Sequence, residues 1–202
     1  MKKISCYLYA IALAFLAVGT AMAQPKVIIK AGLNLANFTG DIEDDTKLLP
    51  TFLVGGQAEF DLAENLAVGA GLQLSGKGFK VDDPNFDAKI NPLYLQVPVQ
   101  IIYRNSGFFV GAGPFIGFGI AGKRKVFDES ESIAFGNGEE DDVAPLDYGA
   151  GLELGYEFMS FRATAAYNVG LANVIPSDQR GDASVKTSVI GIALAYIFGG
   201  SE

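Results

Sequence analysis

The stretch GFFVGAGPFIGFGIAG, Gly107 to Gly122, decides the fold. It contains no charged residue, yet two kinds of residue alternate along it. Even positions from Phe108 to Ile120 are mostly bulky and apolar, whereas odd positions are glycine except for Phe109 and Phe115. A period of two is that of a β-strand, whose successive side chains point to opposite faces. The stretch therefore predicts a strand with two different faces, and it is too short for a membrane helix.

The same alternation recurs in seven other segments. In each, large apolar residues occupy one parity, and the other parity holds mainly glycine, alanine, glutamine or other small or polar residues. The apolar residues are every second residue in the ranges Val27–Leu35, Phe52–Phe60, Leu66–Leu74, Leu93–Tyr103, Leu146–Tyr156, Phe161–Tyr167 and Ile190–Phe198. The chain is thus predicted to be all-β, with eight strands.

The connections between these segments alternate in length. Long ones cover residues 38–47, 77–89, 123–145 and 170–186, and short ones cover 61–65, 104–107 and 157–160. Short periplasmic turns and longer outer loops are typical of barrels in the outer membrane. We therefore predict an eight-stranded antiparallel up-and-down transmembrane β-barrel, with both ends of the mature chain periplasmic and a long, acidic third outer loop.

Aromatic residues give an independent indication, because membrane barrels carry aromatic girdles where the wall crosses each interface. Six aromatic residues lie on the apolar parity at strand ends next to a short turn or the C-terminus. This predicted periplasmic girdle consists of Phe60, Tyr103, Phe108, Tyr156, Phe161 and Phe198. A soluble periplasmic lipid carrier, with its larger apolar face inside, stays an alternative that cell fractionation would test.

The first 23 residues read as a signal peptide, with Lys2 and Lys3, an apolar stretch and Ala21-Met22-Ala23 before the expected cleavage site. Residues 24–202 then form one barrel domain. The single cysteine, Cys6, belongs to the signal. Removal of the signal peptide leaves 13 basic and 23 acidic residues. The resulting net charge of -10 disfavours nucleic acid as a partner.

Little in the chain points to catalysis. The sequence has no histidine, which excludes histidine-based triads and most zinc sites. Gly111-x-Gly113 lacks the helix that a dinucleotide loop needs, and the acidic loops at residues 41–45, 128–130 and 138–142 lack the spacing of a dedicated calcium loop. We expect no enzyme activity, no cofactor and no dedicated metal site. Binding of divalent cations by the acidic loops stays an alternative.

Two interior features stand out. Arg162 faces inward, and a Tyr156 to Phe161 pairing across the turn would place Glu153 and Glu157 diagonally beside it, which predicts an interior ion pair or triad. The alternative is an ion path gated by Arg162.

Pro98 and Pro114 lie inside strands, although proline cannot donate to the ladder. A Tyr103 to Phe108 pairing would place Pro98 opposite Gly113 and Pro114 opposite Val97. We predict a bulge or a gap in hydrogen bonding on this wall. The irregularity is either a kink or a docking seam for a partner.

An ordered series of motifs resembles the outer-membrane β-barrel family that includes the PorT-type proteins. The motifs are KAGLNLANFTGD (30–41), GGQAEFDLAENLAVGAGLQLSGKGFK (55–80), NPLYLQVPVQIIYR (91–104), GFFVGAGPFIGFGIAGK (107–123), DYGAGLELGYEF (147–158) and YNVGLANV (167–174). The resemblance implies a barrel in a Gram-negative cell envelope, inserted by the barrel-assembly machinery, with outer-membrane lipid and lipopolysaccharide as neighbours and an envelope protein as a further partner.

The resemblance implies no single activity. We expect a structural or interaction role at the cell surface, as an accessory to a secretion or assembly system. The alternative is a small pore or solute-binding barrel.

Overall fold

The computed structural model describes residues 25–42, 46–83, 86–127 and 129–199, so the predicted signal peptide lies outside the described residues. Within these ranges the chain forms a single sheet of 11 strands. The strands are β1 (Lys26–Gly40), β2 (Thr46–Lys47), β3 (Leu49–Ala63), β4 (Leu66–Gly76), β5 (Phe79–Asp83), β6 (Phe86–Asn105), β7 (Phe108–Val126), β8 (Glu129–Ser132), β9 (Leu146–Phe158), β10 (Phe161–Gly170) and β11 (Val185–Phe198). No helix in the described part is long and apolar enough to cross a membrane.

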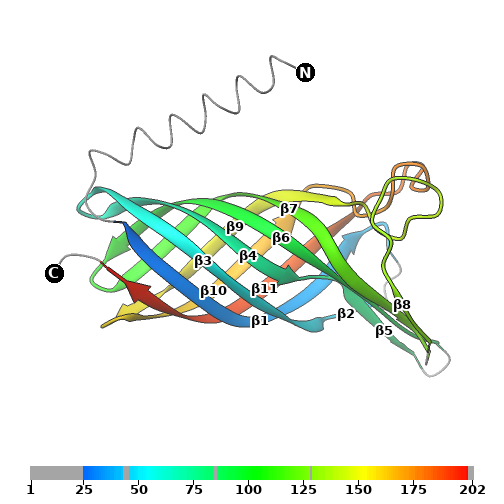
Figure 1. Cartoon of the computed structure of the whole chain (residues 1–202), viewed down its shortest axis with the longest axis horizontal. Coiled ribbons are helices and arrows are strands. Elements are labelled where there is room, and N and C mark those ends of the chain that lie inside the picture. Colours follow the sequence, from blue (N-terminus) through cyan, green and yellow to red (C-terminus); the bar gives the residue numbers. More distant parts are fainter. Residues whose placement is uncertain (1–24, 43–45, 84–85, 128, 200–202) are drawn as a thin grey trace, which may run out of the picture.

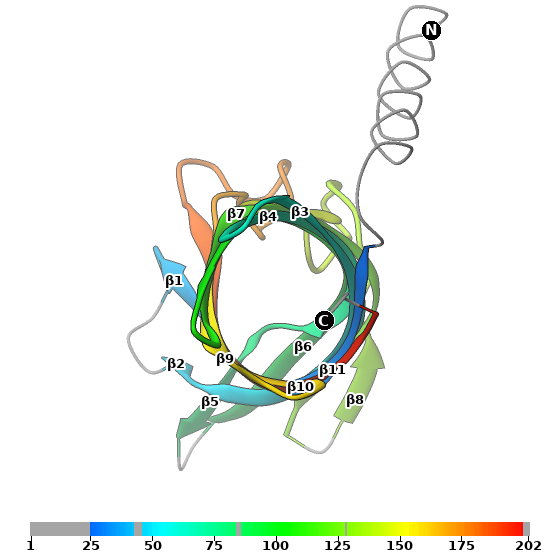
Figure 2. The ribbon, with the colours of Figure 1, turned by 90° about the vertical axis from the view of Figure 1, so that its left-hand side faces the viewer.

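Eight long strands close into a barrel (Figures 1 and 2). Going round the wall, the order is β6, β4, β3, β1, β11, β10, β9 and β7, and pairing of β6 with β7 completes the circle. All neighbours are antiparallel. β1 begins and β11 ends at the same end as the short turns, with Val27 opposite Phe198. The predicted eight-stranded up-and-down barrel is confirmed.

The two faces of the wall are sorted as the alternation predicts. On β7, Phe109 and Phe115 are 3% and 4% exposed and point into the lumen, whereas Phe108 is 67% exposed on the outside. Large apolar side chains cover the outer face of every long strand, Ile192 and Leu194 among them. A continuous apolar outer surface of this kind indicates contact with lipid and argues against a soluble carrier.

The prediction that residues 77–89 and 123–145 are loops is partly wrong, because strands continue into both ranges. Phe79, Val81, Ala88 and Ile90 alternate with polar residues, so β5 and the start of β6 form a hairpin beyond the barrel mouth. The end of β7 pairs with this hairpin, and β2 and β8 add short edges. This extension, β2, β5, residues 86–91, residues 123–126 and β8, is the outer ribbon (Figure 1).

Apolar side chains from separate outer segments meet over the barrel mouth. The outer apolar cluster consists of Phe38, Tyr94, Ile133, Val143, Val174 and Val185. Phe135 joins it, with its ring 5.9 Å from that of Tyr94. A Cβ atom at Gly119 would lie 2.2 Å from the Phe135 ring, so the glycine makes room for this aromatic side chain. The third loop therefore folds inward over the lumen.

Candidate functional site

The lumen is filled by charged side chains that face one another from different strands. Among the described residues, five basic and five acidic side chains form this lumen network. Its members are Lys26, Lys30, Glu59, Asp61, Lys77, Arg104, Asp147, Glu153, Glu157 and Arg162. They come from the inward parity of their strands, or directly follow a strand. The formal charges balance within the network, as buried charges require.

The layer nearest the short turns is built around Glu59, which is almost fully buried. Arg162 donates Nη1 and Nη2 to the two carboxylate oxygens of Glu59, at 2.6 and 3.0 Å. Arg104 also donates to Glu59, and Gln57 adds a bond of 3.0 Å. Arg162 further contacts Glu157, and its guanidinium lies 4.4 Å from the centre of the Phe109 ring. Glu59 and Glu157 each contact both Arg104 and Arg162, and therefore hold the two arginines in fixed positions.

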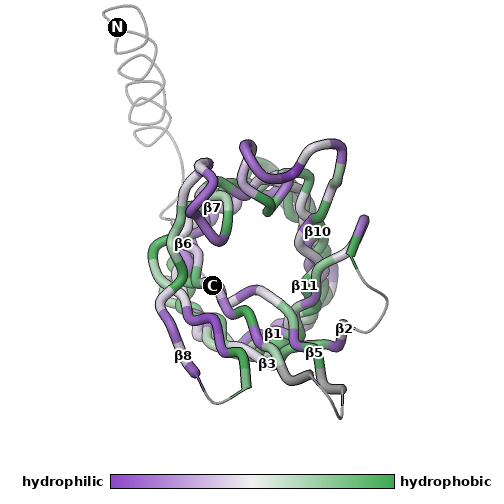
Figure 3. The backbone as a smooth tube through the Cα atoms, turned by 90° about the vertical axis from the view of Figure 1, so that its right-hand side faces the viewer, coloured by the Kyte–Doolittle hydropathy of each residue, from purple (hydrophilic) through white to green (hydrophobic). Residues whose placement is uncertain are grey.

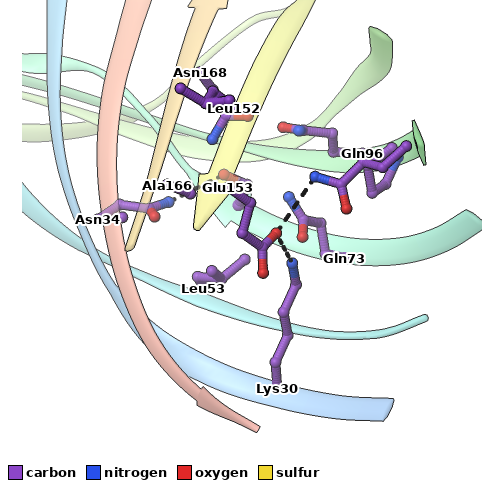
Figure 4. A pocket seen from close by; sticks show the side chains of 13 residues that line it. Lys30, Asn34, Leu53, Gln73, Gln96, Leu152, Glu153, Ala166 and Asn168 are labelled. Atoms are coloured by element: carbon purple, nitrogen blue, oxygen red, sulfur yellow. Dashed lines mark hydrogen bonds and ion pairs between the residues drawn. The ribbon is translucent and has the colours of Figure 1, made fainter. Parts of the chain in front are cut away.

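The middle layer is smaller. Lys30 on β1 donates to Glu153 on β9 over 3.1 Å, and the two side chains point toward each other across the lumen (Figure 4). Gln100 reaches the same carboxylate oxygen at 3.4 Å. The cavity beside them has a volume of ≈ 20 Å³, about the space of one or two water molecules. Gln73 lines this cavity, and its buried Oε1 has no partner in the described structure.

The outer layer lies directly below the outer apolar cluster. Lys77 donates to Asp147 over 2.5 Å, and Thr187 donates to the same carboxylate oxygen at 3.0 Å. The Lys77 ammonium is 4.4 Å from the ring centre of Phe115 and 5.2 Å from that of Tyr94. Lys77 and Asp147 are both essentially inaccessible to solvent. This arrangement obstructs the lumen with aromatic rings as well as with an ion pair.

The three layers and the outer apolar cluster together close the passage through the barrel. Eight strands already enclose a lumen that side chains can fill. Each charged member has an oppositely charged partner, so an ion entering the lumen would have to displace an existing pair. The arrangement is suited to holding the wall rigid.

The predicted environment of Arg162 is partly wrong. Phe161 pairs with Phe158 rather than Tyr156, which places Glu157 directly opposite Arg162 and Glu153 opposite Ala166. Glu157 contacts Arg162. Glu153 instead pairs with Lys30 in the middle layer, because this register carries it away from Arg162. The missed partner is Glu59, which comes from the far side of the barrel.

The predicted positions of the two prolines also need correction. Pro98 lies opposite Phe115, not Gly113, because Tyr103 pairs with Val110 rather than Phe108. The ladder between β6 and β7 has no pair at Val99/Pro114 or at the adjoining Gln100/Gly113, and the ladder between β4 and β6 skips Pro98 and Val97. Each interruption includes a proline, which has no N–H to donate. A bulge occurs farther along the same wall, between Leu93 and Tyr94.

The residues predicted for the periplasmic girdle lie at the short-turn end of the barrel. Five of them are exposed on the outer face, and Phe60 is half-buried. The rings of Phe108 and Tyr156 meet edge to face at 4.8 Å. Tyr196 joins Phe161 and Phe198, with ring centres 5.4 and 4.6 Å away. Sequence parity identified Tyr196 as outward-facing but did not include it in the girdle.

The third loop is fixed to its surroundings by polar bonds as well as by its apolar residues. Arg124 in the outer ribbon donates to Asp142 at 2.7 Å and to Glu131 at 2.5 Å. The hydrogen bond with Glu131 and the charge of Asp142 raise the pKa of Arg124 above its usual value. In the fourth loop, Gln179 donates to the carbonyl oxygens of Gly138 and Asp141. The two loops therefore form one connected surface.

Comparison with known proteins gives a family match over most of the chain. The family model described as outer membrane protein beta-barrel domain matches residues 22–176. No curated protein matches the chain significantly.

Several solved structures are similar. Ail of Yersinia pestis is 14% identical, covers 87% of this chain and 100% of its own, and gives a TM-score of 0.48. Neisserial surface protein A is 12% identical, with coverages of 88% and 99% and a TM-score of 0.47. The N-terminal barrel of Pseudomonas aeruginosa OprF is 13% identical, with coverages of 87% and 100% and a TM-score of 0.36.

Proposed function

Because this chain belongs to the outer membrane protein beta-barrel family, we propose that it works as a closed barrel with a structural or interaction role at the cell surface. The closed lumen is the observation that carries the proposal. The lumen network occupies the bore, and the outer apolar cluster covers its mouth. Because the passage is blocked at several levels, a function carried out by the outer surface of the barrel is favoured over transport through the lumen.

The proposed orientation places both ends of the mature chain in the periplasm and the outer ribbon outside the cell. The short turns share one end of the barrel with the start of β1 and the end of β11. Long connections and the connected third and fourth loops lie at the other end. Outer-membrane barrels generally have their longer loops outside.

Interaction through the third and fourth loops is the specific form of this proposal. The chain has no histidine and its one cysteine lies in the predicted signal, so a catalytic role has little support. The expected neighbours are outer-membrane lipid and lipopolysaccharide, the assembly machinery during insertion, and an envelope protein. The PorT-type resemblance supports an accessory role in secretion or surface assembly. A small pore has less support, since the middle cavity measures ≈ 20 Å³.

Single cysteines test the orientation, because the mature chain has no other thiol. Asp182→Cys lies in the fourth loop and Glu64→Cys in a short turn, and both positions are exposed. A membrane-impermeant maleimide should label Asp182→Cys on intact cells, and Glu64→Cys only after the outer membrane is opened. The reverse pattern would overturn the orientation.

Photo-crosslinking tests the interaction role. A photo-reactive amino acid at Arg180 in the exposed fourth loop should yield one defined envelope-protein adduct in living cells. The same group at Glu64 is the matched control and should not yield that adduct. Loss of a secreted or surface-assembled protein on deletion of the gene would support the accessory role. Identical adducts at both positions, or none at Arg180, would contradict a protein partner at these loops.

A further inference from the structure

The outer ribbon carries a row of lysines that cross four neighbouring strands. Lys47 on β2 pairs with Lys80 on β5, Lys80 pairs with Lys89 on β6, and Lys89 pairs with Lys125 on β7. Lys123 lies two residues from Lys125 and therefore shares its face. These five residues are the lysine stripe. At the usual spacing between strands, the row of four is about 14 Å long.

Like charges directly opposite each other across strands destabilise a sheet unless other groups offset them, and Lys47, Lys80 and Lys125 do interact within the protein. Lysines often protect sheet edges from aggregation, but Lys89 and Lys125 lie on β6 and β7, which have strands on both sides. Concentration of positive charge is also unexpected in a chain with a net charge of -8. The concentration of positive charge on one face, with Lys89 and Lys125 away from a sheet edge, is the feature that suits a negatively charged ligand.

The opposite face of the ribbon shows which way the stripe points. Phe79 and Ile90 pack against the outer apolar cluster, and the Phe79 ring lies 5.1 Å from that of Phe38. Since side chains alternate along a strand, Lys80 and Lys89 point the other way. Figure 3 shows hydrophilic segments at β2, β5 and β8 around the outer end. The stripe is therefore on the outside of the wall.

The bulge in β7 aligns the stripe with the lipid-facing surface below it. Leu93 pairs with Ala121 and Tyr94 with Gly119, so Ile120 is an extra residue at this point. Beyond it the outward parity changes, and Lys123 and Lys125 are exposed on the same side as Phe118. Without the bulge, these two lysines would point toward the barrel axis.

The height of the stripe corresponds to the head-group layer. Phe108 and Phe118 are the first and last outward aromatic residues on the barrel part of β7, and the exposed Ile120 follows at the bulge. Ten residues span about 34 Å, which at a tilt of about 40° gives a height of about 26 Å, close to the apolar band of such barrels. Lys123 then lies roughly 10 Å farther out. Lipid phosphates are found just beyond the hydrocarbon layer.

We propose that the lysine stripe binds the phosphate groups of a phosphorylated glycolipid in the outer leaflet. This rests on the proposed orientation, with the outer ribbon outside the cell. Ammonium groups bind phosphate as point charges, and several close together increase affinity for an anionic lipid surface. Lys47, Lys80 and Lys125 also interact within the protein, so the proposal depends on their shared face and not on unoccupied charges.

Two double variants test the site in the purified full-length mature barrel. Lys89→Gln/Lys125→Gln removes two positive charges from the stripe. Arg180→Gln/Lys186→Gln removes the same charge from the outer end near the fourth loop and is the control. The probes are diphosphorylated lipid A in mixed micelles, the same lipid after enzymatic dephosphorylation, inorganic phosphate and heparin. Binding is measured by titration calorimetry, and thermal stability is measured in parallel.

The unaltered barrel should bind the phosphorylated lipid and bind its dephosphorylated form much more weakly. The stripe variant should bind the phosphorylated lipid about tenfold more weakly or worse, with the control unchanged. Equal binding by both variants, equal binding of both lipids, or tighter binding of phosphate or heparin would overturn the proposal. A stripe variant that loses thermal stability while binding the lipid normally would do so too, because the lysines would then serve only the stability of the sheet.

Micelle binding does not depend on orientation in the cell. Failure here with normal maleimide labelling would reject the lipid site alone. Reversed labelling with normal lipid binding would reject the proposed orientation alone.

Discussion

Arg162 and Glu59 form a bidentate ion pair across the lumen, although 103 residues separate them in the chain. Arg162 lies on β10 and Glu59 on β3, and β11 and β1 stand between these strands in the wall. The pair therefore joins two parts of the barrel that no backbone ladder joins directly. Both side chains are almost fully buried.

Arg162→Met should lower the free energy of unfolding by about 3 kcal/mol, because it leaves part of the Glu59 charge without a partner. Arg104 still contacts Glu59, which limits the loss. The change is measured by urea unfolding in lipid vesicles. The folded fraction is determined from the difference in gel mobility between the folded and the heat-unfolded barrel.

A double-mutant cycle with Glu59→Leu isolates the pair, and we expect a coupling of about 1–3 kcal/mol. The control cycle, Arg124→Met with Glu131→Leu, removes a more exposed ion pair and should give under about 1 kcal/mol. Equal coupling free energies in the two cycles would show that the lumen pair stabilises the barrel no more than an exposed ion pair does.

Gly55 and Gly56 should respond differently to alanine. A Cβ atom at Gly55 would lie 2.4 Å from Cβ of Gln73 and 2.6 Å from the carbonyl oxygen of Leu72, whereas at Gly56 the nearest atom is 3.5 Å away. Gly55→Ala should therefore cost about 1–3 kcal/mol of unfolding free energy through overpacking. Gly56→Ala is the control and should be neutral or slightly stabilising. A larger loss at Gly56 would contradict the assignment of the crowded, inward position.

Gln179 should hold the third loop closed over the barrel. Its side chain donates to the carbonyl oxygens of Gly138 at 3.0 Å and Asp141 at 2.6 Å. Gln179→Ala should speed cleavage by a glutamate-specific protease at Glu139 and Glu140 several-fold, since local opening precedes proteolysis. Arg180→Ala, at the next exposed position, is the control. Unchanged cleavage in Gln179→Ala would mean that Gln179 does not hold the loop and that its other contacts, such as Arg124 with Asp142, are sufficient.

The strand faces could be predicted because they depend only on parity. Phe109 and Phe115 are buried and Phe108 is exposed, as the alternation on β7 predicts. Lys30 and Glu59 lie on the parity opposite to the apolar sides Val27–Leu35 and Phe52–Phe60. Their role as lumen charges was not predicted, although a charged residue on an inward parity is the signal that indicates a buried partner.

The pairing registers could not be predicted, because they depend on turn geometry. The turn after β9 needs only two residues, with Met159 at a φ of 53°, a conformation usually assigned to glycine or asparagine. The turn after β6 is equally short, with Ser106 at 52° and Gly107 at 85°. Longer turns were expected at both places. The resulting shifts preserved every face but changed the partners of Arg162 and Pro98.

Contacts between side chains across the lumen are even harder to predict from the sequence than the pairing registers. Lys30 and Glu153 meet because β1 and β9 curve round the same bore, and 123 residues separate them. No ladder or periodicity connects these strands. Their pairing depends on closure of the whole barrel, which sets which inward side chains face one another.

Conductance of the purified barrel in a planar lipid bilayer tests the closed lumen most directly. We predict no stable unitary conductance above that of the bare bilayer, because paired charges and the outer apolar cluster fill the passage. Insertion is verified independently by protease protection in the same lipids. A stable, sizeable conductance that changes in Arg162→Met would contradict the account and identify the lumen as an ion path.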